Sequence, residues 1–131
     1  MIKLSSILGM LTANLQAHKL CKKVTILETR ELSTDQFTFK IRADLISEYR
    51  LQIRYYSNFE HLDYAYQLIK ADQSIMRWDN KEEFQNLETY PHHYHDPSGN
   101  IQPSSLTGTP QNDIIYVLQQ LDNFLAASNE K

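Results

Sequence analysis

The chain has 131 residues, the length of one domain, and a net charge of −3. No overall positive field would draw it onto nucleic acid, so any contact with RNA or DNA needs a local basic patch. Its single cysteine, Cys21, excludes an intrachain disulfide. Because the sequence has neither the apolar core of a signal peptide nor the ~20 apolar residues of a membrane span, we expect a cytoplasmic protein without a membrane partner.

The first twenty residues predict an N-terminal helical extension. Apolar residues recur there at intervals of three and four positions: Leu4, Ile7, Leu8, Leu11 and Leu15. This spacing predicts an amphipathic helix over residues 4–17.

From about residue 22 the apolar residues recur at every second position. Residues 37–45 and 49–56 each alternate in this way, with a tight connection that predicts a hairpin. Residues 61–71 and 74–79 predict two further strands, and residues 24–30 are a candidate fifth. Short connections imply an antiparallel meander over residues 22–79, because parallel strands need long crossovers.

Residues 80–109 predict a polar loop, and the chain then ends in a helix. All four prolines and two of the three glycines fall within residues 80–110. Thr109 is a suitable N-cap before Pro110, and an apolar stripe follows to predict a helix over residues 110–127. We therefore predict a single α+β domain, residues 1–131, with a four- to five-stranded antiparallel meander sheet and both helices packed on one face.

The loop contains the residues best suited to chemistry. Three of the five histidines occur in the segment Pro91-His92-His93-Tyr94-His95. Imidazole exchanges protons near neutral pH and also binds metals, so acid–base catalysis, a metal site and a purely structural polar loop all remain open. With Asp79, a His-x-His pair would offer three metal ligands, but the other parts of a zinc motif are missing. Our prediction includes no metal and no cofactor.

Arg77 and Asp79 are two residues apart on a predicted strand and therefore share a face, with Trp78 on the other face. They form either a local ion pair or a phosphate-binding arginine beside a carboxylate that orients a histidine. The polar positions of the predicted hairpin carry further cations that are either solvated or a basic stripe for phosphate: Lys40, Arg42, Arg50 and Arg54. Tyr64 and Tyr66 share one strand face and are either core residues or a surface on which bases stack.

These motifs together resemble a known family. Arg77-Trp78-Asp79-Asn80 followed by Pro91-His92-His93-Tyr94-His95 resembles the paired motifs of TumE-like proteins, and Arg42-Ala43-Asp44 and Tyr64-Ala65-Tyr66 are similar to two of that family's strands. The resemblance covers roughly residues 35–126. Where the family usually has a further Pro-His-His segment, this chain has Lys81-Glu82-Glu83-Phe84.

The resemblance implies the toxin component of a toxin–antitoxin system, held inactive by a cognate antitoxin and suspected of cleaving RNA. We therefore predict a metal-independent ribonuclease of unknown oligomeric state. The predicted catalytic residues are His92, His93, His95, Arg77 and Asp79, and the predicted substrate-binding residues are Arg42, Arg54, Tyr64, Tyr66 and Asn80. A non-catalytic protein-binding module and a metal-dependent nuclease or hydrolase are the alternatives.

Overall fold

A computed structural model describes residues 3–59 and 61–129; Met1 and Ile2 of the predicted extension and Glu60 of the predicted sheet lie outside the described residues. An N-terminal helix, α1 (Leu4–Ala17), precedes the strands and a C-terminal helix, α2 (Pro110–Asn129), follows them. The strands are β1 (Cys21–Ser33), β2 (Gln36–Leu45), β3 (Arg50–Asn58), β4 (His61–Lys70), β5 (Gln73–Asp79), β6 (His93–His95) and β7 (Ile101–Pro103), and a 3₁₀ turn, η1 (Ile46–Glu48), joins β2 to β3.

The described strands form one sheet in chain order, β1 to β7, and every neighbouring pair is antiparallel. The α+β meander is as predicted, but the prediction of four to five strands was wrong because the sheet has seven. β6 and β7 lie within residues 80–109, which we predicted to be a loop. Each of these strands has three residues, too few to show an alternating pattern, so partners rather than intrinsic periodicity define them.

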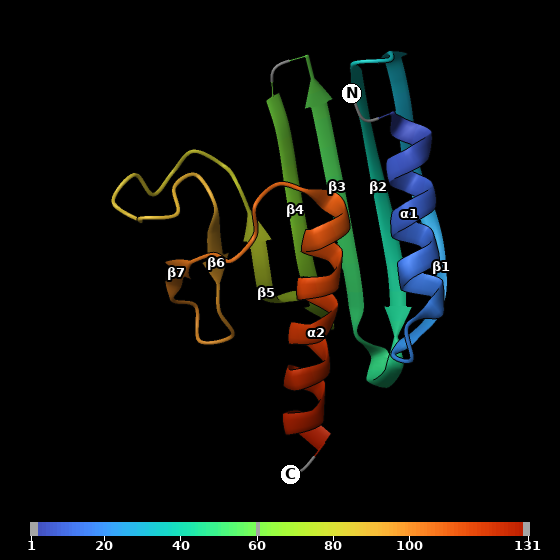
Figure 1. Cartoon of the computed structure of the whole chain (residues 1–131). Coiled ribbons are helices and arrows are strands. Elements are labelled where there is room, and N and C mark those ends of the chain that lie inside the picture. Colours follow the sequence, from blue (N-terminus) through green and yellow to red (C-terminus); the bar gives the residue numbers. More distant parts are fainter. Residues whose placement is uncertain (1–2, 60, 130–131) are drawn as a thin grey trace.

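The two faces of the sheet differ because one is covered by helices. In Figure 1 both helices lie on the same side of the sheet, with α1 over its β1–β2 end and α2 over its middle. Strand β2 shows the consequence, since its buried and half-buried residues alternate without interruption. The opposite face is free of helices in the part of the chain that the structure describes. The polar residues at alternate positions of the strands lie on this face.

The hydrophobic core lies between the helices and the sheet. Both helices contribute one stripe to it, as the three- and four-residue spacing predicts. The buried stripe of α1 is Leu4, Ile7, Leu11 and Leu15, and that of α2 is Ile114, Val117, Leu118, Leu121 and Leu125. The residues predicted as an N-terminal extension thus pack into the same hydrophobic cluster as the sheet.

The first turn of α2 holds the residues that precede the helix through hydrogen bonds. Pro110 is the first helical residue, as predicted. Asp113, in the first turn and buried, accepts hydrogen bonds from the backbone N–H groups of Thr107 and Gly108. Negative charge is favourable at a helix N-terminus, so this carboxylate anchors the segment that connects β7 to α2.

Candidate functional site

Strand register assembles the site on the face of the sheet that carries no helix. Arg54, Ala65, Asp79 and His93 lie side by side on the four consecutive strands β3 to β6. Arg77 pairs with His95 two residues further along the same two strands. Because side chains at alternate positions share a face, the guanidinium and carboxylate of β5 project beside the two imidazoles of β6.

Asp79 is the centre of this group. Its Oδ2 accepts a hydrogen bond of 2.8 Å from Arg77 Nε and lies 3.7 Å from His95 Nε2. Its Oδ1 accepts a hydrogen bond of 3.0 Å from the backbone N–H of Lys81 and lies 3.0 Å from His93 Nε2. The carboxylate is buried, so charge-assisted contacts on both oxygens compensate for its lost hydration.

His93 is held between Asp79 and the backbone and is 1% exposed. Its Nδ1 lies 3.1 Å from the carbonyl oxygen of Pro91, which can only accept, so Nδ1 is the donor. Nε2 faces the carboxylate but makes no aligned hydrogen bond. In the neutral imidazole this leaves a lone pair facing a carboxylate oxygen, which is an arrangement that a cation stabilises.

His95 is the imidazole of the pair that solvent reaches, with 32% of its side chain exposed. Its ring centre lies 5.0 Å from that of His93, and the ring of Phe84 packs edge-on against both. Burial lowers the pKa of His95 below its ordinary value; the charge of Asp79 raises it, whereas His93 and Arg77 lower it further. A neutral imidazole at physiological pH can accept a proton, which suits His95 to the role of a base.

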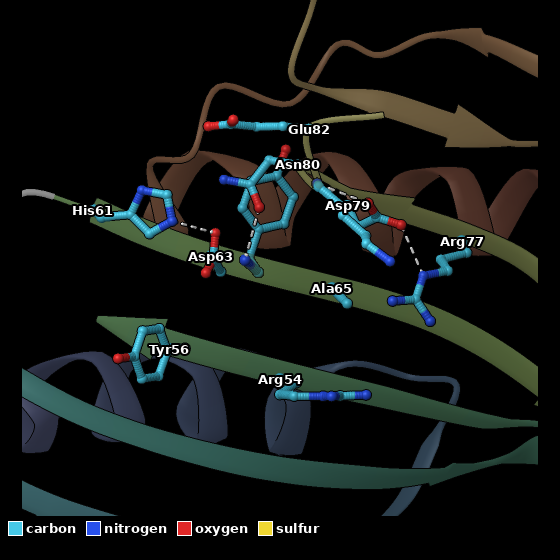
Figure 2. A pocket seen from close by; sticks show the side chains of 11 residues that line it. Arg54, Tyr56, His61, Asp63, Ala65, Arg77, Asp79, Asn80 and Glu82 are labelled. Carbon is cyan, nitrogen blue, oxygen red and sulfur yellow. Dashed lines mark hydrogen bonds and ion pairs between the residues drawn. The ribbon is translucent and has the colours of Figure 1, made fainter. Parts of the chain in front are cut away.

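An open cleft of about 470 Å³ runs along the same face beside Asp79. Figure 2 shows Arg54 and Arg77 on opposite sides of Ala65, whose small side chain leaves the space between them open. Arg54 is exposed and has no ion-pair partner among the described residues. The cleft is lined by Arg54, Tyr56, His61, Asp63, Tyr64, Ala65, Arg77, Asp79, Asn80, Lys81 and Glu82.

The third predicted histidine, His92, lies on the other side of the sheet. Its Nδ1 is 2.6 Å from the hydroxyl oxygen of Tyr64, and the two rings stack. Burial lowers the pKa of His92. The structure therefore separates His92 from His93 and His95, since consecutive residues of an extended segment face opposite ways.

Tyr64 and Tyr66 lie on the helix-covered face of the sheet. Both are buried, the hydroxyl groups of Tyr55 and Tyr66 are hydrogen-bonded, and burial raises the pKa of all three tyrosines. The structure thus matches the core interpretation of the tyrosines, and neither ring presents a free face on which a base could stack.

The remaining predicted substrate-binding residues are dispersed. Arg42 is on the open face but three strands from Arg77, roughly 14 Å at the usual strand spacing, and it lies 3.5 Å from Asp44. Asn80 joins β4 to the end of β5, because its side chain accepts a hydrogen bond from Tyr64 N and donates one to Leu62 O. Of this predicted group, Arg54 is the residue whose guanidinium is both exposed and in the cleft.

Sequence reasoning missed Phe84, Ala65 and the pair formed by His61 and Asp63. His61 Nε2 lies 2.9 Å from Asp63 Oδ1 at the other end of the cleft. Strand alternation contained a signal for two of them, because Asp63 and Ala65 alternate along β4 with the buried Tyr64 and Tyr66. Phe84 gave no signal, since a single aromatic residue in a polar segment has no periodicity to place it.

The donor atoms at the centre of the site could also hold a metal. Asp79, His93 and His95 each provide one ligand atom within 4.8 Å of the others.

No helix among the described residues is long and apolar enough to span a membrane.

Comparison with known proteins gives one family. The model of a family described as Toxin TumE matches residues 11–126, and this match begins well before the region over which the sequence motifs resemble TumE-like proteins. No curated protein and no solved structure matches the chain. Because the matched region is most of the chain, this protein belongs to the TumE toxin family.

Proposed function

We propose that this toxin acts in the cytoplasm as a ribonuclease that needs no metal ion, with its catalytic centre on the open face of the sheet. The observation that carries the proposal is the contact of one buried carboxylate, Asp79, with the guanidinium of Arg77 and with two imidazoles. A half-exposed base beside a cleft that contains two arginines is what phosphodiester transfer requires, because the reaction moves a proton and builds negative charge on phosphorus.

RNA carries its own nucleophile, the 2′-hydroxyl group, so the protein has only to position and activate it. In the proposed reaction the 2′-oxygen attacks the adjacent phosphorus while its proton passes to an imidazole nitrogen of His95. The bond from phosphorus to the 5′-oxygen breaks, and that oxygen takes a proton from water. The products are a 2′,3′-cyclic phosphate and a 5′-hydroxyl end.

Each of the other groups has a separate part in this proposal. Arg77 and Arg54 bind the phosphate from the two sides of Ala65 and stabilise the charge that develops on it. Asp79 holds Arg77 in place, and buried His93 fixes Asp79 from the opposite side. His93 is therefore a positioning residue, because a side chain that is 1% exposed does not reach a substrate.

The decisive test of the reaction is the need for the 2′-hydroxyl group. Purified protein is incubated, in a buffer containing a chelator, with a single-stranded RNA and with the same sequence made as DNA. We expect cleavage of the RNA alone, with cyclic phosphate ends. Equal cleavage of both polymers, or cleavage of RNA only when the chelator is left out, would refute the proposed chemistry.

A toxin without catalysis is the second candidate. It is favoured by apolar side chains left exposed on the edge strand β1, namely Ile26, Leu27 and Leu32, since such side chains on a surface often mark a protein interface. The two candidate functions predict different toxicity for a variant that lacks the proposed catalytic base. If the His95→Ala variant still arrests growth, the toxin acts by binding.

A further inference from the structure

We propose that Asp79, His93 and His95 bind a divalent transition-metal ion of the zinc type. One ligand atom from each of the three residues lies within 4.8 Å of the others. Nitrogen and oxygen ligands of tetrahedral zinc, at 2.0–2.1 Å from the ion, are about 3.3–3.4 Å apart, so small side-chain rotations bring the three atoms into range.

The buried imidazole supplies the second observation. His93 Nε2 is buried without an aligned hydrogen bond, and it points at Asp79 Oδ1 at 3.0 Å. With Nδ1 donating to Pro91 O, the neutral imidazole turns its lone pair toward the carboxylate, which also offers lone pairs. A metal ion between His93 Nε2 and Asp79 Oδ1 would replace the repulsion of two lone pairs by two coordination bonds. The same ion could also be bound by His95.

The groups around the ligands are those that support a metal centre. Ligand histidines usually donate their second nitrogen to a carbonyl or carboxylate oxygen, as His93 does to Pro91 O. The ligand carboxylate is itself held, since Asp79 Oδ1 accepts from Lys81 N and Oδ2 accepts from Arg77 Nε. The ring of Phe84 packs against both imidazoles, with its plane nearly perpendicular to theirs.

The donor set selects the class of ion. Two imidazoles and one carboxylate favour zinc, copper, nickel or cobalt over magnesium and calcium, which prefer oxygen ligands. Three protein ligands leave a fourth position open, and the cleft lies beside Asp79. An ion and a transferred proton compete for the same imidazole lone pairs, so the metal-bound form differs from the form that the proposed acid–base chemistry uses.

The test is a calorimetric titration of metal-free protein with Zn²⁺, in the absence of RNA. We expect one ion per chain, at least roughly tenfold weaker binding to the His95→Ala variant, and unchanged binding to the His61→Ala variant. His61 is the matched control because it is also paired with a carboxylate on the same face, but it lies outside the ligand set. His95 is partly exposed, so its replacement leaves the core intact.

The visible absorption spectrum of bound Co²⁺ reports the coordination geometry of the site. Co²⁺ bound to the wild type should give the intense visible absorption of a four-coordinate ion, and this absorption should be lost in the His95→Ala variant. Absence of stoichiometric Zn²⁺ binding, or equal binding by both histidine variants, overturns the proposal. Because no RNA is present, that result leaves the proposed ribonuclease untouched, and a protein that binds Zn²⁺ but cleaves no RNA refutes only the proposed function.

Discussion

At the scale of single residues, Asp79 holds the site together. It is buried, and it contacts a guanidinium, a backbone N–H group and two imidazoles. A carboxylate in such a position stabilises the fold and the site at once, because its removal leaves the guanidinium of Arg77 without its counter-charge. The open face offers a natural comparison in Asp63, whose contact with His61 is about half exposed to solvent.

This difference predicts unequal costs for two identical substitutions. Asp79→Asn removes the charge at constant shape and should lower the free energy of unfolding by about 2–3 kcal/mol, because it breaks buried charge-assisted contacts. Asp63→Asn should cost under about 1 kcal/mol, because water screens an exposed pair. Urea denaturation of both variants measures these values, and a similar cost for the two would show that Asp79 is not a buried anchor.

At the scale of elements, the cleft has its floor where β4 carries a small residue between a long cationic side chain and the carboxylate of the site. Ala65 stands between Arg54 on β3 and Asp79 on β5, whose backbones are about 10 Å apart at the usual strand spacing. Two arginines alone do not make a phosphate-binding site, because the space between them also has to be large enough for a phosphate group. The floor of the cleft is therefore as specific a feature as its charges.

Filling that floor should weaken RNA binding without unfolding the sheet. We expect Ala65→Leu to lower the affinity for single-stranded RNA by roughly tenfold or more, the equivalent of one lost charge-assisted hydrogen bond. Gln36→Leu, on β2 and outside the lining of the cleft, is the matched control and should change affinity less. Fluorescence anisotropy measures both affinities, and equal effects would place the RNA elsewhere.

The helices contribute through burial, and α2 offers two aliphatic residues of equal size that differ in burial. Leu121 is fully buried against the sheet, whereas Ile115 is 60% exposed. Leu121→Ala should therefore cost about 2–5 kcal/mol of unfolding free energy, and Ile115→Ala should change it by no more than about 0.5 kcal/mol. Chemical denaturation checks this pair, and comparable losses would mean that α2 packs with a different face.

At the scale of the whole molecule, the sequence predicted the layers but not the full sheet. Alternation in residues 37–45 and helical spacing in residues 4–17 and 110–127 identified the long elements, because each has enough residues to show its period. β6 and β7 were missed, since three-residue strands are defined by pairing with β5 and with each other. The presence of the last two strands therefore depends on tertiary contacts and not on the local sequence.

The candidate site was predictable to the same extent. Arg77, Asp79, His93 and His95 could be proposed together from residue type and spacing, and the structure brings them into contact. His92 could not be excluded from sequence alone, because its face depends on whether residues 92–95 are extended. The roles of Phe84 and of the cleft floor could not be predicted, because they depend on packing between strands and a loop that are separate in the sequence.

Membership of the TumE toxin family makes a prediction for the intact system, with the antitoxin as partner. Expression of this chain alone should arrest growth, and co-expression of the neighbouring open reading frame should restore it. Colony counts after induction measure the effect. Normal growth during confirmed expression of the chain alone would contradict a toxin role.

The central claim is that the open-face cluster is a ribonuclease centre, and the rate of RNA cleavage in chelator-containing buffer tests it most directly. His95→Ala should reduce this rate roughly 100- to 10,000-fold, the usual contribution of a general base. His18→Ala, which removes an imidazole paired with Asp122 on another part of the molecule, should leave the rate at the wild-type value. An unchanged rate in the His95→Ala variant, or no cleavage by the wild type, would contradict the claim.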